Sequence, residues 1–232
     1  MKQSHELRWG GLAGVASILA ALIGRLVMGS APQLTEPAMT ISGFLTERRV
    51  QVLAAALLYA VAAALLLWFG VALATAMRRA DETSDAPALV LAGYVLLAAI
   101  GFIGISMFAG MTYAITTHPP LLAIAAGPYT VLTVMDAITG IAMTVPFGAS
   151  AAAIMRTNIF PLWMAWLAIV VAVVAVLGAF TIVNTGGAVV PGGPVAIVLG
   201  VLTALWVLAA SWFLIREHLP IPATGARPAM GH

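Results

Sequence analysis

The sequence predicts an all-α, polytopic membrane protein with six transmembrane helices in one bundle and both termini in the cytoplasm. The first observation is composition: 62% of the residues are hydrophobic, 8% are charged, and the mean hydropathy is +1.09. A soluble domain cannot cover itself with so few polar side chains. The second is a set of six apolar stretches, each of about 20 residues or more, the length that crosses a hydrocarbon layer of about 30 Å. The third is the placement of Lys and Arg at the ends of these stretches.

The apolar stretches define the predicted spans and the domain organisation. We expect spans at residues 9–29, 50–77, 87–115, 128–155, 161–184 and 194–215. Proline opens four of them, at a position where its missing amide hydrogen costs nothing: Pro87, Pro128, Pro161 and Pro194. A six-helix transmembrane domain therefore occupies residues 1–219, and the Pro- and Gly-rich residues 220–232 are predicted to form a disordered cytoplasmic tail.

Basic residues in the short loops predict the orientation. Only Arg48 and Arg49 fall on one side of the predicted membrane. The other side carries Lys2, Arg8, Arg78, Arg79, Arg156, Arg216 and Arg227. Because short cytoplasmic loops are enriched in Lys and Arg, both termini are predicted to be cytoplasmic in a multi-pass protein of the cytoplasmic (inner) membrane.

The first span has an alternative interpretation as a signal peptide. Lys2 and Arg8 precede an apolar stretch that ends in Val27-Met28-Gly29, which is small enough at the cleavage positions. The stretch is long for a signal sequence, however, and Arg25 lies in its last turns, where such sequences carry no charge. We therefore interpret it as a membrane span.

The longest outer loop, residues 30–49, is predicted to cover the outer face. Within it, Ser42 to Val50 has the composition of a short interfacial helix. A helix at this position would lie in the membrane plane and cap the six spans.

Two ionisable residues lie inside the predicted spans: Arg25 in the first and Asp136 in the fourth. Each costs about 2.5 to 3.5 kcal/mol near a helix centre, so such residues face protein and find partners. At about 1.5 Å per residue, both lie roughly 6 to 12 Å below the outer interface. Their similar depth predicts a buried Arg25–Asp136 ion pair.

Three roles are open for these two residues. They can hold two helices together as a structural pair, or they can form a ligand or ion site. Alternatively, Arg25 extends by itself to the interface along its long apolar stem.

Four further polar residues belong to the candidate ligand or ion site: Tyr59, Tyr113, His118 and Thr133. Tyr59 and Tyr113 lie in the outer half of their spans, and Thr133 shares a helix face with Asp136. Pro146 is predicted to kink the fourth span near Ala142. In transporters, interrupted helices beside an acidic residue form central binding sites.

The composition excludes several chemistries. The chain has no cysteine, so it forms no disulfide and no thiolate metal site. All four histidines lie in predicted tails or a loop, and no pattern indicates a metal, a cofactor or nucleic-acid binding. No catalytic machinery is visible. A lipid-modifying enzyme would need groups that converge on the outer side, where only Glu36, Glu47, His118 and Asp136 are available.

Two segments carry a family resemblance. The first is Arg8-Trp9-Gly10-Gly11-Leu12-Ala13-Gly14, in which Gly10 and Gly14 permit close helix approach. The second is RTNIFPLWMAWLAIVVAVVA at residues 156–175. Together they resemble a bacterial family of six-span membrane proteins grouped as domain of unknown function 4386. The resemblance implies the same architecture and no activity. This chain has Asn158 where the family pattern has Gly, and Leu162 where it has a basic residue.

The sequence therefore predicts an integral membrane protein with a structural or accessory role, in which the Arg25–Asp136 pair packs the bundle. The alternative is a small transporter or ligand-binding membrane protein that uses Asp136 beside a kinked fourth span. The expected partners are the lipid bilayer and either a second copy or another membrane protein. Geometry distinguishes the two functions, because the first requires a dry pair and the second a water-accessible cavity at Asp136.

Overall fold

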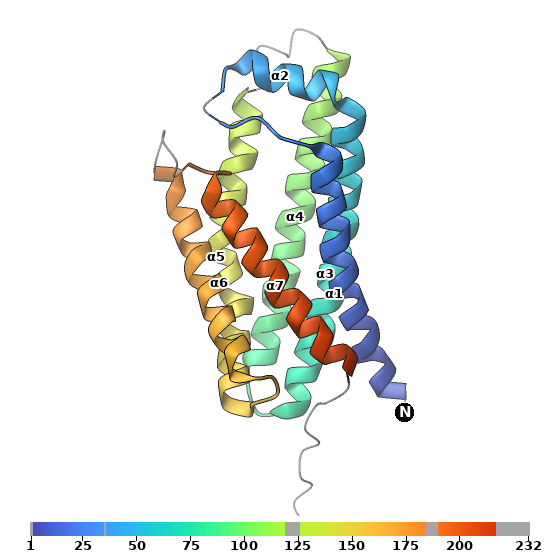
Figure 1. The fold of residues 1–232 in the computed structure, drawn as a ribbon, viewed down its shortest axis with the longest axis vertical. Helices are drawn as coiled ribbons and strands as arrows, with labels where there is room; N and C mark the ends of the chain where they lie inside the picture. The colour runs from blue at the N-terminus through green and yellow to red at the C-terminus, as the bar shows by residue number, and fades with distance from the viewer. Residues whose placement is uncertain (1, 35, 119–125, 184–189, 217–232) are drawn as a thin grey trace, which may run out of the picture.

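The computed structural model describes residues 2–34, 36–118, 126–183 and 190–216, with side chains from Glu6 onward. Within these ranges the chain is all-α, as predicted, and contains no β-strand (Figure 1). Its helices are α1 (Lys2–Met28), α2 (Ala38–Glu47), α3 (Arg49–Ala80), α4 (Ala86–Thr117), α5 (Ala126–Thr157), α6 (Leu162–Phe180), the 3₁₀ turn η2 (Thr181–Val183) and α7 (Pro194–Arg216). The predicted disordered tail at residues 220–232 lies outside the described residues.

Six segments are long and apolar enough to cross a membrane, which confirms the predicted spans. These are α1 from Glu6, α3, α4, α5, α6 together with η2, and α7. The helices α3, α4 and α5 each contain 32 residues, or about 48 Å, so they project beyond a hydrocarbon layer of about 30 Å.

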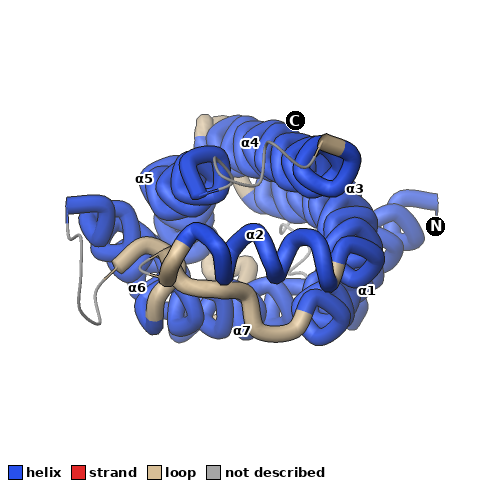
Figure 2. The backbone as a smooth tube through the Cα atoms, turned by 90° about the horizontal axis from the view of Figure 1, so that it is seen from above, coloured by secondary structure: helices blue, strands red, loops and turns tan. Residues whose placement is uncertain are grey.

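The spanning helices pack side by side in the order α1, α3, α4, α5, α6, α7 and back to α1. Seen end-on, this ring is crossed by α2 (Figure 2). The start of α1 and the end of α7 lie at the opposite end of the molecule (Figure 1). We call that end the terminal end and the end crossed by α2 the cap end. That the terminal end faces the cytoplasm is a prediction from the basic residues.

The larger core fills the terminal-end half with aromatic side chains from four helices. Trp206 of α7 meets Phe69 and Phe147 edge-on, with ring centroids 6.5 Å and 5.1 Å away. The indole nitrogen of Trp206 donates a hydrogen bond to the carbonyl oxygen of Met164, at 3.1 Å. Edge-to-face geometry and a satisfied indole N–H are the arrangement that stabilises buried aromatic residues.

Three glycines of α1 allow close approach at the terminal end. Gly10 lies against Ala72 of α3, where a Cβ on the glycine would collide with the alanine methyl group. A Cβ on Gly11 would lie 2.8 Å from the carbonyl oxygen of Ser211, and Gly14 packs against Phe69 and Ser211. The Gly10-x-x-x-Gly14 pattern therefore marks a helix contact, as in other membrane helices that pack through small residues.

At the cap end, α2 lies across the ring and covers a second, smaller core. Ile41 and Leu45 of α2 are buried together with Val52, Ile115 and Tyr129. The capping helix agrees with the prediction but begins at Ala38 instead of Ser42, directly after Pro37. It ends at Glu47, and α3 starts at Arg49 after the single residue Arg48.

Asn158 ends α5 in a left-handed backbone conformation. It follows the end of α5 with φ = +51°, and its N–H donates to the carbonyl oxygen of Ile154, at 2.8 Å. This conformation favours glycine, and asparagine tolerates it better than other side chains do. Asn158 therefore takes a position at the end of α5 that suits glycine or asparagine.

An ion pair joins the last turn of α5 to the residue that follows α3 at the terminal end. The guanidinium of Arg156 lies 3.4 Å from the carboxylate of Asp81. Asp81 also accepts hydrogen bonds from the hydroxyl of Thr83, at 2.8 Å, and from its N–H, at 3.1 Å. The Thr83 hydroxyl, with Arg156 contributing, lowers the pKa of the Asp81 carboxyl below its ordinary value.

Replacing Gly10 with Ala is expected to destabilise the protein by about 1–3 kcal/mol, because the new methyl group overpacks the contact with Ala72. Thermal unfolding in detergent or nanodiscs measures the effect as a lower Tm. The matched control is Gly43→Ala in α2, where no atom lies within 4 Å of the added methyl. Equal melting temperatures for the two variants would contradict the close approach of α1 and α3.

Thr83→Ala is expected to lower the Tm slightly at pH 7, whereas Thr83→Ser keeps the hydroxyl and the stability. Since the folded-state pKa of Asp81 is lowered, its contribution is complete above the ordinary value of about 3.9 and disappears as the pH falls through the lowered value. Melting curves over a pH series should therefore show the two variants converging in acid. A difference in Tm that persists at the lowest pH would show that Thr83 stabilises the protein by an interaction other than its hydrogen bond to Asp81.

Candidate functional site

On α5 and α7, the stretches between the two cores have no buried residue. Buried side chains fall into one cluster in the terminal-end half and another under α2. Between them, residues 130–139 of α5 include no buried residue, and neither do residues 194–205 of α7. Both stretches belong to the cap-end half of their helices.

A cavity of ≈ 260 Å³ occupies this region on the side of α5, α6 and α7. Its walls are Asp136, Ala137, Thr139, Met143, Gly178, Thr181, Val190, Gly192, Ala196, Leu199 and Gly200. The side chain of Asp136 is exposed, although protein atoms surround it on most sides. The side chain is exposed yet surrounded by protein because it faces the cavity instead of the outer surface.

Asp136 has no protein partner among the described residues. No side chain or backbone N–H of those residues donates a hydrogen bond to it, and no cation pairs with it. The neighbouring hydroxyls are engaged within their own segments: Thr139 donates to the carbonyl oxygen of Met135 at 2.8 Å, and Thr181 to that of Gly178 at 2.6 Å. Among the described residues that line the cavity, Asp136 is the only charged one.

The predicted buried pair between Arg25 and Asp136 does not form, and that prediction was wrong. Arg25 is exposed and donates a hydrogen bond to the carbonyl oxygen of Gly29, just past the end of its own helix. That end leaves carbonyls without intrahelical partners, which supply an acceptor for Arg25. Arg25 therefore extends toward the cap end, as in the alternative in which it reaches the interface alone.

Arg25 nonetheless lies near tyrosines of two other helices. Its guanidinium is within electrostatic range of Tyr59 on α3 and of Tyr129 on α5. Tyr59 is also within electrostatic range of Asp136. The hydroxyl of Tyr129 donates to the carbonyl oxygen of Pro32 at 2.8 Å, so it lies near the cap end. Tyr59 therefore lies near both the Arg25 guanidinium and the Asp136 carboxylate.

The other predicted site residues are divided between this region and the cap end. Thr133 lies one turn from Asp136, where its hydroxyl donates to the carbonyl oxygen of Tyr129 at 3.0 Å. Tyr113 is exposed, and the guanidinium of Arg49 lies 4.8 Å from its ring centroid. His118 follows α4, with Nδ1 2.9 Å from the hydroxyl of Thr117. Neither Tyr113 nor His118 lines the cavity.

Pro146 does not interrupt its helix. α5 is continuous from Ala126 to Thr157, and Pro146 is buried within it. Its ring packs on Gly93 of α4, where an added Cβ would lie 2.8 Å from the proline nitrogen. Pro146 therefore belongs to the contact between α4 and α5, away from Asp136.

The sequence did not indicate the opposite wall of the cavity, which is formed by Gly178, Thr181, Gly192 and Gly200. These residues have small side chains or none, so they leave space beside Asp136. Gly192 adopts φ = +76°, a conformation that favours glycine, and it turns the chain into α7. In the sequence, the feature that could have indicated this wall was a group of small residues near the ends of two apolar spans.

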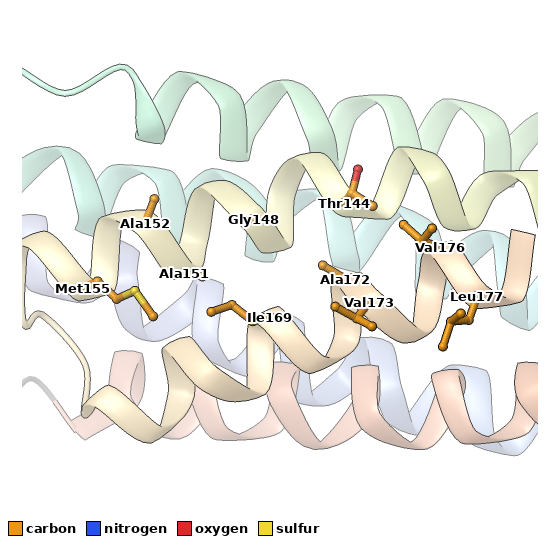
Figure 3. A pocket seen from close by; sticks show the side chains of 10 residues that line it. All are labelled: Thr144, Gly148, Ala151, Ala152, Met155, Ile169, Ala172, Val173, Val176 and Leu177. Atoms are coloured by element: carbon orange, nitrogen blue, oxygen red, sulfur yellow. The ribbon is translucent and has the colours of Figure 1, made fainter.

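A larger groove of ≈ 520 Å³ lies between α5 and α6 (Figure 3). It is lined by alanine, glycine and aliphatic side chains, with Thr144 as the one polar residue. The Thr144 hydroxyl donates to the carbonyl oxygen of Ile141 at 2.6 Å, so it is already satisfied. The groove has the shape to hold an apolar chain, but it offers no group for chemistry or for polar recognition.

No family model, curated protein or solved structure matches the chain. Membership of the six-span family of unknown function accordingly stays a prediction, and function has to be argued from the site itself. In the parts of the chain that the structure describes, no three His, Asp or Glu side chains cluster closely enough to hold a metal ion.

The cavity has the chemistry of a cation site. A carboxylate without a protein partner is stabilised by a positive charge or by hydrogen-bond donors, and a ligand in the cavity can supply either. Its surroundings are apolar side chains and satisfied hydroxyls, so they supply no second acid or base. Binding is therefore the function that this arrangement supports, in preference to acid–base catalysis.

Asp136→Asn is expected to leave the Tm within about 2 °C of the wild type, or to raise it, because the change removes an unpaired charge. Breaking a buried ion pair would instead cost about 3–5 kcal/mol. Thermal unfolding in nanodiscs separates these outcomes, with Arg25→Gln measured in parallel. A large loss of Tm in Asp136→Asn would mean that the carboxylate has a stabilising partner in the folded protein.

Proposed function

We propose that this protein is a small transporter or ligand-binding protein of the cytoplasmic membrane, with both termini in the cytoplasm, and that it binds a cationic group at Asp136. The observation that carries the proposal is an unpaired carboxylate in the cap-end half of a membrane helix, facing a cavity of ≈ 260 Å³. Ionisable residues inside the membrane mark substrate or ion pathways when they face a cavity.

The ligand class follows from the cavity wall. A single carboxylate matches a single positive charge, and the aliphatic side chains around it favour a monovalent cation or a small amine. A divalent metal ion would require several oxygen ligands from charged or carbonyl groups. The structural or accessory role lost its main support when the Arg25–Asp136 pair proved absent.

The orientation in this proposal has independent support from charge. Arg78, Arg79, Arg156 and Arg216 lie in the last turns of α3, α5 and α7, at the terminal end. Arg48 and Arg49 lie at the cap end. The excess of basic residues at the terminal end favours a cytoplasmic position for it, so the cavity would lie nearer the outer face.

Binding of methylammonium to the purified protein in detergent tests the proposal, with sodium and potassium chloride as competitors. We expect the wild type to bind one of these cations and Asp136→Asn to bind it at least about tenfold more weakly, since charge-assisted hydrogen bonds contribute about 1.5–3 kcal/mol. The matched control is Asp85→Asn, which removes an exposed carboxylate at the start of α4. Equal binding by both variants, or no binding by the wild type, would reject Asp136 as the site.

A further inference from the structure

The polar side chains on the cavity wall share one property, which is that each offers a hydrogen-bond acceptor. Asp136 contributes its carboxylate oxygens. Thr139 and Thr181 use their hydroxyl hydrogens within their own segments, where they donate to the carbonyl oxygens of Met135 and Gly178. A threonine hydroxyl has one hydrogen and two lone pairs, so each oxygen can still accept a hydrogen bond. Among the described lining residues, these three side chains therefore offer acceptors and no free donor.

The three acceptors lie on two walls of the cavity. Asp136 and Thr139 are three residues apart on α5, which places their side chains on the same face of that helix. Thr181 begins η2, directly after α6, and belongs to the opposite wall. The end of a helix has carbonyl groups without intrahelical partners and carries partial negative charge. A positive group in the cavity would therefore have acceptors of hydrogen bonds on both sides.

The start of α7 also borders the cavity, but most of its N–H groups are already used. Pro194 has no N–H, and those of Ala196 and Ile197 donate to the carbonyl oxygen of Gly193, at 3.0 Å and 3.4 Å. A helix start with free N–H groups attracts anions. Three of the first four residues of α7 thus offer no donor to a ligand, and the cavity keeps its preference for a cation.

The remaining side chains of the wall are apolar. Met143, Val190 and Leu199 are the largest of them, and no described lining residue is aromatic. One water molecule takes up about 30 Å³ of the liquid, so the cavity of ≈ 260 Å³ is much larger than a single ammonium group or alkali ion. The additional space, bounded by apolar side chains, suits an alkyl group, because burying one removes apolar surface from water.

We infer that the cavity binds a primary alkylamine in its ammonium form, with Asp136, Thr139 and Thr181 accepting its N–H groups and the apolar wall holding its alkyl group. The inference rests on the proposed cation site and names its substrate class. A primary ammonium has three N–H donors, which match the three acceptor side chains. Its hydrogen bond to the Asp136 carboxylate joins two charged groups and is the strongest of the three. The two threonines determine specificity.

The same chemistry predicts which cations the cavity rejects. A quaternary ammonium has no N–H donor, and the described wall has no aromatic face to bind it by a cation–π interaction. Sodium and potassium ions would fill only part of the cavity and would leave the apolar side chains in contact with water. A primary amine with a short alkyl chain should therefore bind more tightly than methylammonium, a quaternary amine or an alkali ion.

Calorimetric titration of the full chain in detergent with four cations tests this order. We expect butylammonium to bind at least about tenfold more tightly than methylammonium, since each buried CH₂ group contributes about three- to fourfold. Butyltrimethylammonium, which has the same chain and no N–H, should bind at least about tenfold more weakly than butylammonium, and so should sodium. Equal affinity for butylammonium and butyltrimethylammonium, or tighter binding of sodium than of butylammonium, would overturn the inference.

Variants of the two threonines test their part in specificity. Thr139→Val and Thr181→Val keep the branched shape and remove the hydroxyl, so each should weaken butylammonium about tenfold and leave butyltrimethylammonium unchanged. The matched control is Thr144→Val, because the Thr144 hydroxyl also donates within α5 but faces the groove between α5 and α6. Thr181→Ser retains the hydroxyl and should retain the preference for butylammonium. Loss of the preference in both Thr181 variants, or in neither valine variant, would contradict the role of the hydroxyls.

The space for the alkyl group is tested separately at Gly200. This glycine lines the cavity, and no atom lies within 4 Å of a Cβ added to it. Gly200→Val should therefore fill part of the cavity, weaken butylammonium by about tenfold and leave methylammonium within about twofold of the wild type. The matched control is Gly148→Val, which meets no atom within 4 Å and lines the groove instead. Unchanged binding of butylammonium by Gly200→Val would contradict the placement of the alkyl group.

The same titrations separate this inference from the proposed function. If methylammonium or sodium binds in a manner that depends on Asp136, but butylammonium has no advantage and neither threonine matters, the cation site stands and the alkylamine assignment fails. If no cation depends on Asp136, both fail. If butylammonium binds most tightly and requires Asp136 and both threonines, both are supported.

Discussion

The close approach of α1 to α3 and α7 at Gly10, Gly11 and Gly14 is the contact on which the rest of the arrangement depends. In a bilayer no hydrophobic force drives helices together, since lipid tails are as apolar as leucine, so association relies on shape and on close backbone contact. These glycines hold three helices together at the terminal end, beside the aromatic core around Trp206. Toward the cap end, α1 packs on α3 at Gly24 and Leu58, and α7 packs on α6 at Leu199 and Gly178.

The two charged residues inside the spans are accommodated in different ways. Arg25 satisfies part of its guanidinium with a carbonyl that the end of α1 leaves free. Asp136 has no such group within reach in the described structure and faces a cavity. A lone carboxylate in a dry, filled core would carry a far larger desolvation cost. The cavity is therefore the feature that makes Asp136 compatible with a stable fold, and it is the same feature that makes the residue available to a ligand.

Much of the fold could be predicted from the sequence because local patterns determine it. Apolar stretches of sufficient length located the six spans, and the glycine spacing in α1 located a helix contact. The pairing of Arg25 with Asp136 failed for a geometric reason. Counting residues along a helix gives the depth of a side chain but not the order of the helices around the ring. α1 and α5 are not neighbours in that order, so equal depth did not bring their side chains together. The far wall of the cavity was missed because glycine and threonine in apolar spans are common at ordinary helix contacts.

The unequal lengths of the helices have a consequence for the surrounding bilayer. α3, α4 and α5 each extend for 32 residues, or about 48 Å, whereas the span formed by α6 and η2 has 22 residues, or about 33 Å. The helical wall that lipids meet beside this span is therefore shorter than the wall formed by α3, α4 and α5. Mismatch of this kind costs fractions of a kcal/mol per Å and is relieved by local thinning or tilting. A change in bilayer thickness should therefore act on this protein mainly at α6, which is one of the helices that border the cavity.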